Sequence, residues 1–321
     1  MMRQLHSGMI VLLSLGLVLF WVGDKTLGAD FPEKSIRVIA PYNAGSGTDM
    51  EARGIAPYIQ KHLGVQVIIE NVPGADSKIG VTRAWKARPD GYTLIIHTTT
   101  QSMMVEILLN AEYRTRDFSH IYSWSVTNQI LLVHSEGWKT FDDLVKAARA
   151  GTLSVGIPGR GTSAHLSGLI LVDALGIKVN WIPFDSGGAA VAALAGKHID
   201  FSVVATTVAP PLVKAGKLRP LLMFAGSRDM VFPDVPLARD LGYKFTMIPA
   251  IRGIDGPPHM DSRIIKVLEQ AVSKAVKEPD FLAWAKDKIQ IVPCNHEEYG
   301  RNILDQQKAI EQYKGFLKTE K

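Results

Sequence analysis

Short apolar runs rich in β-branched residues alternate along the chain with longer stretches whose apolar residues recur at helical spacing. The short runs predict strands at 35–40, 65–70, 93–97, 153–157, 179–183, 199–204 and 218–225. Helical spacing predicts helices at 48–63, 79–87, 141–150, 262–277 and about 297–316. Thr140 and Asp143 form a capping signal in front of helix 141–150, and Gly151 follows its last residue. This alternation predicts an α/β fold in which mostly parallel sheets are flanked by helices.

The first thirty residues have the layout of a secretory signal peptide. Arg3 precedes an uncharged apolar block at 8–23, and Ala29 is a small residue directly in front of Asp30. An uncleaved membrane anchor is the alternative, but the block is shorter than the roughly 20 residues that span a bilayer. We therefore expect residues 1–29 to be removed as a signal peptide and the rest of the chain to be periplasmic.

The composition excludes several classes of protein. With 321 residues, of which 46% are apolar and 21% charged, the chain can fill ordinary cores, and at ~150 residues per domain it suggests two domains. The 36 Lys and Arg residues are spread among 31 Asp and Glu residues, so no basic cluster indicates a nucleic-acid partner. Cys294 is the single cysteine and cannot form an internal disulfide; we expect a buried, inert thiol.

Two segments share one pattern, which is a strand, a proline, a short loop, Gly-x-Gly-Thr and a helix. They are residues 36–49 (IRVIAPYNAGSGTD) and 153–165 (LSVGIPGRGTSAH). The repetition predicts two similar lobes, each with a helix N-terminus at the carboxyl end of its sheet, where open α/β sheets bind ligands. Unpaired backbone N–H groups and the helix dipole favour an anion there. Arg160 adds a positive charge to the second loop, which suits a carboxylate.

The sequence also bears on other interpretations of the first loop and on the role of Asp185. A nucleotide-binding loop is excluded, because Met50 stands where the dinucleotide fingerprint requires Gly and the P-loop signature is absent. A tight turn in which Thr48 or Asp49 caps the following helix remains the alternative for the first loop. Asp185 follows another predicted strand, and we expect it either to cap the next helix or to orient a ligand.

Catalytic and metal-binding patterns are missing from the sequence. It contains no Gly-x-Ser-x-Gly elbow and no His-Glu-x-x-His motif, and its nine His residues show no metal-ligand spacing. Ser163 and His165 lie two positions apart on a predicted helix, so their side chains diverge. An exported two-lobe chain without catalytic residues, metal or cofactor is best interpreted as a solute receptor.

Further motifs accompany the two loops in a fixed order. They are ENVPGA at 70–75, PDGYTL at 89–94, IPFDSGGAAVAALAGKHIDF at 182–201, AGKLRPLL at 215–222 and FPDVPLARDLG at 232–242. Together with PYNAGSGTD at 41–49 and GIPGRGTSAHL at 156–166, this series resembles the solute-binding receptors of tripartite tricarboxylate transporters, the Bug or TctC family. The resemblance covers nearly everything after residue 30.

The chain also departs from the pattern of that family. Asp76-Ser77-Lys78 follow Pro-Gly-Ala, where Gly or Asn is usual. A Trp commonly precedes the Gly of the crossover segment, where this chain has Ala250-Ile251-Arg252-Gly253. Glu51 stands where apolar residues are common. These changes lie near the expected cleft or hinge, so the ligand specificity of a relative does not carry over.

The resemblance implies a type 2 periplasmic binding fold, with two lobes, two hinge crossovers and a ligand between the lobes. The first lobe would comprise residues 31–130 with 245–321, and the second residues 131–244. The implied ligand-binding residues of the first lobe are Tyr42, Ser46, Gly47, Thr48, Ala75, Thr98 and Thr99. Those of the second lobe are Arg160, Gly161, Thr162, Ser163 and Asp185.

The resemblance also implies a function. Such a receptor is a monomer that closes on a small carboxylate-bearing molecule, without a cofactor or metal, and delivers it to the membrane permease subunits of the transporter. One alternative is a sensory module that presents the same closed state to a histidine kinase. Another is an enzyme, for which Asp185 is the only credible general base.

Overall fold

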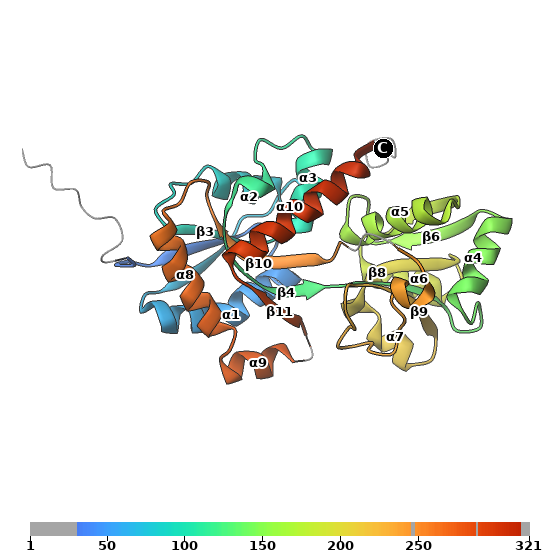
Figure 1. Ribbon diagram of the computed structural model, residues 1–321. Coiled ribbons are helices and arrows are strands. Elements are labelled where there is room, and N and C mark those ends of the chain that lie inside the picture. Colours follow the sequence, from blue (N-terminus) through green and yellow to red (C-terminus); the bar gives the residue numbers. More distant parts are fainter. Residues whose placement is uncertain (1–30, 245–247, 287, 316–321) are drawn as a thin grey trace, which may run out of the picture.

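The computed structural model describes residues 31–244, 248–286 and 288–315 of the 321-residue chain. The predicted signal peptide, residues 1–29, lies outside the described residues. Within the described ranges, no helix is both long and apolar enough to span a membrane. The chain forms two lobes, each built on one sheet with helices packed against both faces (Figure 1).

Each lobe has its own sheet. The strands of the first sheet, in sheet order, are β11 (Gln290–Cys294), β4 (Ser119–Thr127), β10 (Ala250–Gly256), β3 (Thr93–Thr98), β1 (Ile36–Ala40) and β2 (Val67–Asn71). Those of the second sheet are β7 (Val179–Pro183), β6 (Leu153–Ile157), β8 (Phe201–Ala205), β5 (Gln129–His134) and β9 (Leu218–Phe224). The strands predicted from the sequence are confirmed, with ends that differ by two residues or fewer.

Both sheets are mixed, which corrects the expectation of mostly parallel sheets. In the first sheet β1 is parallel to β2 and β3, whereas β10 is antiparallel to β3 and β4. In the second sheet β6 is parallel to β7 and β8, whereas β5 is antiparallel to β8 and β9. The path of the chain is the cause, because β4 leads directly into β5 of the other lobe and β10 brings the chain back (Figure 1).

The helices occupy the positions that the sequence predicts, with additions. In the first lobe they are α1 (Gly47–Leu63), α2 (Lys78–Trp85), α3 (Thr99–Leu108), α8 (Ser262–Ala275), α9 (Pro279–Ala285), α10 (His296–Gln312) and the 3-10 turn η1 (Thr115–Asp117). In the second lobe they are α4 (Phe141–Ala150), α5 (Ser163–Leu175), α6 (Gly187–Ala195), α7 (Pro210–Lys214) and the 3-10 turns η2 (Thr206–Val208) and η3 (Ala238–Leu241). The capping box of Thr140 and Asp143 is present at α4.

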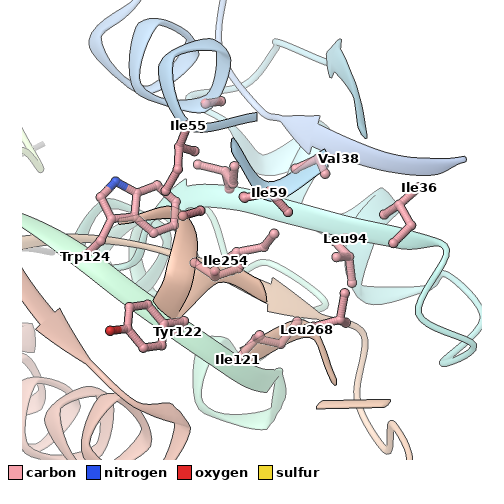
Figure 2. Packing of buried hydrophobic residues seen from close by; sticks show 14 of the residues in the cluster. Ile36, Val38, Ile55, Ile59, Leu94, Ile121, Tyr122, Trp124, Ile254 and Leu268 are labelled. Carbon is pink, nitrogen blue, oxygen red and sulfur yellow. The ribbon is translucent and has the colours of Figure 1, made fainter. Parts of the chain in front are cut away.

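The core of the first lobe lies between its sheet and the pair of helices α1 and α8 (Figure 2). Ile55 and Ile59 of α1 pack in one cluster with Val38 and Leu94 of the sheet and with Leu268 of α8. The buried face of α8 is the face that the apolar spacing predicts. This packing fixes α1 on one face of the sheet and places its N-terminus near the carboxyl end of β1.

An apolar cluster also joins the two lobes. Leu166, Leu169 and Ile170 of α5 pack in one cluster with residues of α3 and α10, among them Met104 and Ile303. Helix α5 is therefore covered by its own sheet on one side and by the first lobe on the other. This explains why its sequence is apolar nearly all round, since a helix buried on several sides needs no polar face.

Candidate ligand-binding cleft

Helix α1 begins at the carboxyl end of β1, after the first glycine-containing loop. Ser46 is its N-cap, because the Oγ atom of Ser46 accepts a hydrogen bond from the amide of Asp49 at 3.2 Å. The alternative in which Thr48 or Asp49 caps this helix is therefore wrong. Asp49 instead closes the loop, since its carboxylate accepts a hydrogen bond from the amide of Gly45 at 2.9 Å. The amides of Gly47 and Thr48 lie in the first turn and have no acceptor within the helix.

Helix α5 begins in the same way at the carboxyl end of β6. Thr162 is its N-cap, and its Oγ1 atom accepts from the amide of His165 at 3.2 Å and donates to the carbonyl of Gly159 at 3.0 Å. The Nδ1 atom of His165 accepts a hydrogen bond from the amide of Gly161 at 3.1 Å, so the helix holds the loop in front of it. The first amides of α5, including that of Ser163, have no acceptor within the helix.

The two helix N-termini line one cavity of about 290 Å³ between the lobes. The predicted site residues that the structure brings together there are Tyr42, Ser46, Gly47, Thr48, Thr98, Thr162 and Ser163. Two helix N-termini in one cavity favour an anion, because unpaired N–H groups and helix dipoles both attract negative charge. The volume suits a small molecule, since it lies just below the roughly 300–1,000 Å³ typical of ligand pockets.

The other predicted site residues do not line this cavity. Thr99 is fully buried, and its Oγ1 donates to a backbone carbonyl of β10 at 3.3 Å. Arg160 and Asp185 are exposed, and the helix after Asp185 is capped by Ser186, whose Oγ accepts from a backbone amide of α6. Gly161 shapes its loop with a φ of 70° and lies against α3.

Ala75 also lies outside the cavity lining, at the start of an unusual backbone segment. Ala75, Asp76 and Ser77 have consecutive φ values of 45°, 52° and 83°. A left-handed backbone costs residues with a Cβ atom about 1–2 kcal/mol each and favours Gly or Asn. This accounts for the Gly or Asn expected at the positions after Pro-Gly-Ala. The segment leads directly into α2, beside the loop that carries Tyr42.

Several residues that line the cavity were missed by sequence reasoning. They are Gln101, Thr127, Gln129, Pro158, Ala164, Ala205, Ala250 and Arg252. Arg252 matters most chemically, because it brings a full positive charge to the cavity wall, where it pairs with Glu51. Both charged residues are departures from the resembled pattern, and that departure was the signal available in the sequence. Gln101 carried no comparable signal, since it lies on α3, a helix that the apolar spacing did not predict.

Tyr42 lines the cavity and carries an unpartnered hydroxyl. The hydroxyl oxygen of Tyr42 is buried and has no hydrogen-bond partner in the part of the chain that the structure describes. Burial raises the pKa of Tyr42 above its ordinary value, and the nearby Thr98, Arg252 and Ser77 offset that effect only in part. The phenol is therefore a neutral donor at pH 7. A buried donor without a partner costs about 1–3 kcal/mol, so an acceptor that reaches this hydroxyl would be stabilising.

A second polar cluster lies inside the first lobe and outside the cavity lining. Asp255, fully buried on β10, accepts hydrogen bonds from Nε2 of His97 at 2.8 Å, Nδ1 of His120 at 2.7 Å and the hydroxyl of Tyr299 at 2.9 Å. Burial acts to raise the pKa of Asp255, but His120 and His97 outweigh it and hold the pKa at about 2. The cluster ties β3, β4, β10 and α10 together. Among the residues described, no group of His, Cys, Asp and Glu is arranged to hold a metal ion.

Two α/β lobes that present paired helix N-termini to a shared cleft define the class of two-lobed solute-binding proteins. Residues 51–314 match the model of the tripartite tricarboxylate transporter family receptor, TctC, and the chain belongs to this family. A UPF0065 protein of Agrobacterium vitis is 30% identical over 280 residues, which cover 86% of this chain and 80% of the relative.

Solved structures agree with this assignment. A TctC solute-binding protein from Polaromonas, solved without ligand, is similar with a TM-score of 0.79 and 26% identity, covering 88% of this chain and 100% of that one. MatC from Rhodopseudomonas palustris, solved with bound malate, is similar with a TM-score of 0.70 and 27% identity, covering 90% of this chain and 100% of that one. The predicted two-lobe α/β binding-protein fold is confirmed.

Proposed function

We propose that this protein is a receptor that captures a small carboxylate-bearing molecule between its two lobes. The observation that carries the proposal is that the N-termini of α1 and α5, one from each lobe, line the same cavity. A ligand that accepts hydrogen bonds from both N-termini bridges the lobes and therefore favours their closed arrangement. The malate bound to MatC belongs to this chemical class and supports the proposal.

The chemistry of the cavity wall favours binding over catalysis. Tyr42 and Arg252 are the titratable side chains among the described lining residues. Neither accepts a proton at neutral pH, because burial raises the pKa of Tyr42 and a guanidinium stays protonated. A general base must lie within hydrogen-bonding reach of its substrate, and Asp185 is not among the lining residues. In this proposal the ligand leaves unchanged.

The proposed localisation of the protein is the periplasm, after removal of residues 1–29 as a signal peptide. There the protein acts as a monomer that hands its ligand to the permease subunits of a tripartite transporter in the membrane. The lobes, residues 31–130 with 245–321 and residues 131–244, would close as rigid bodies about the two crossovers. The direct step from β4 to β5 and the longer connection from β9 to β10 support hinges at these points.

The proposal is tested by the melting temperature of the purified protein in the presence of carboxylic acids and of their neutral amides. A ligand at a hundred times its dissociation constant adds about 2.7 kcal/mol of stability. For a chain of this size the melting temperature should rise by about 5 °C or more with a bound acid and stay unchanged with its amide. The bound acid should be recovered chemically intact. If no acid raises the melting temperature, even after unfolding and refolding to remove a co-purified ligand, the proposal is wrong.

A further inference from the structure

A buried ion pair stands at the wall of the cavity. Nη1 of Arg252, on β10, lies 2.6 Å from Oε1 of Glu51, on α1, and their side chains are only 16% and 4% exposed. The other carboxylate oxygen of Glu51 accepts a hydrogen bond from the hydroxyl of Ser125 at 2.6 Å. A guanidinium buried alone would be strongly unfavourable, so Glu51 makes it possible to keep Arg252 at this position.

The ion pair has a defined orientation. Arg252 lines the cavity, whereas Glu51 is absent from its lining and lies behind the guanidinium. Two threonines of the cavity wall hold the guanidinium in place, since Nε donates to Oγ1 of Thr48 at 3.3 Å and Nη1 donates to Oγ1 of Thr127 at 2.9 Å. A ligand in the cavity therefore meets the positive member of the pair first.

The part of the cavity wall next to Arg252 and the start of α1, here called the Arg252 corner, is rich in hydrogen-bond donors. Nη2 of Arg252 makes no hydrogen bond within the described chain, and a Cβ atom added to Gly47 would lie 3.6 Å from it. This nitrogen therefore lies beside the unpaired amides that begin α1, and the unpartnered hydroxyl of Tyr42 is close by. A carboxylate can accept from several such donors at once. A neutral amide brings two N–H donors of its own and satisfies this corner poorly.

We propose that Arg252 determines specificity at the α1 end of the cavity by selecting a ligand with a second ionised carboxylate, and that Glu51 is its positioning residue. The inference rests on the proposed function and adds that the two ends of the ligand are treated differently. The end nearest α5 meets backbone amides and hydroxyl groups, whereas the end nearest α1 also meets a guanidinium. Hydrogen bonds to ionised partners are about twice as strong as neutral ones. Neutralising a carboxylate of the ligand should therefore reduce the binding affinity most at the α1 end.

Matched pairs of ligands test this inference. Succinate, glutarate and adipate are compared by calorimetry with their monoamides, which keep the size of the molecule and lose one charge. The wild type is expected to prefer a diacid over its monoamide by about tenfold or more, because one hydrogen-bonded charge is lost. Arg252→Gln should reduce the preference to about twofold or less. The double variant Glu51→Gln with Arg252→Gln should do the same without leaving a buried carboxylate unpaired.

Two further variants sharpen the result. Arg263→Gln is the matched control, because Arg263 also pairs with a carboxylate, that of Asp261, but lies at the surface outside the cavity lining. It should keep the preference of the wild type. Glu51→Gln alone should lower the preference for the diacid, since the guanidinium loses the carboxylate that holds it at the cavity wall. An unchanged or higher preference would overturn the positioning role of Glu51.

The outcomes separate this inference from the proposed function. A diacid preference that is equal in the wild type and in both variants that lack Arg252 overturns the inference and leaves the receptor proposal standing. Binding of monocarboxylates such as benzoate, but of no diacid, likewise overturns the inference and leaves the receptor proposal standing. A wild-type protein that binds no carboxylate at all overturns both.

Discussion

Gly161, in the loop before α5, lies directly against Leu108 at the end of α3, so that a Cβ atom added to Gly161 would lie 2.5 Å from Cδ1 of Leu108. The two residues belong to different lobes, and the glycine-containing loop before α5 in the second lobe therefore rests on a helix of the first. Gly161 also has a φ of 70°, a conformation that residues with a Cβ atom rarely adopt. Two independent features thus favour glycine at this position.

Gly161→Ala is expected to weaken carboxylate binding several-fold, because the added methyl group displaces Leu108 at the junction of the lobes. Gly216→Ala is the matched control, since Gly216 has a φ of 66° and, apart from its chain neighbours, no atom of the described residues lies within 4 Å of an added Cβ. Both variants should lose about 1 kcal/mol of unfolding free energy through left-handed strain. Calorimetry should detect weaker binding only for Gly161→Ala, and Leu108→Ala in the same chain should restore it. Equal affinities of the two glycine variants would contradict this expectation.

Tyr42→Phe separates a binding role from a structural one. Removal of a buried donor without a partner should leave the unfolding free energy of the empty protein unchanged or raise it by up to ~1 kcal/mol. Affinity for the bound acid should fall about tenfold, because one hydrogen bond to a charged group is lost.

Tyr113→Phe is the control for that experiment. The hydroxyl of Tyr113 is buried as well, but it donates to the carbonyl of Ser102 at 3.0 Å. This variant should lose about 1 kcal/mol of unfolding free energy and bind the acid normally. If Tyr42→Phe instead lost stability and kept its affinity, the hydroxyl of Tyr42 would have no place in the ligand site.

Thr162→Ala is expected to lower the unfolding free energy by about 1 kcal/mol, because the hydroxyl of Thr162 is the N-cap of α5 and also closes the loop on Gly159. Thr162→Ser keeps the hydroxyl and should remain as stable as the wild type. Denaturant titration of both variants measures this difference. A Thr162→Ala protein with wild-type stability would show that the cap contributes little to the position of α5.

The strands and the two glycine-containing loops were predictable because their signals are local. A β-branched run between turns, or a Gly-x-Gly-Thr in front of a helix, restricts the backbone within a few residues. The mixed sheets were not predictable in this way. The directions of β5 and β10 follow from the two passages of the chain between lobes, and no local pattern encodes that path.

The candidate site also combines features with local sequence signals and features that only the fold creates. Ser46, Thr48 and Asp49 are all good capping residues, and only the backbone geometry assigns the cap of α1 to Ser46. Glu51 and Arg252 are 201 positions apart, so their contact is a product of the fold. In a single sequence, Glu51 and Arg252 each stand out only as an isolated departure from the family pattern. The sequence alone therefore gives no reason to expect that the two side chains form a pair.

The buried cluster around Asp255 should make stability depend on pH in the acid range. The pKa of Asp255 is about 2 in the folded protein against an ordinary value of 3.8. Because the folded value is the lower one, the carboxylate contributes stability that is complete above about pH 4 and is lost as the pH falls through about 2. This difference corresponds to about 2 kcal/mol.

Asp255→Asn lacks the titrating carboxylate, so the variant should be clearly less stable than the wild type at pH 7. The gap between the two unfolding free energies should then shrink by about 2 kcal/mol between about pH 4 and pH 2. Urea titrations at each pH measure the gap, and high salt screens exposed pairs such as Asp261 with Arg263, which is not buried. A gap of constant size across this range would mean that the histidines do not hold the carboxylate of Asp255 in its charged form.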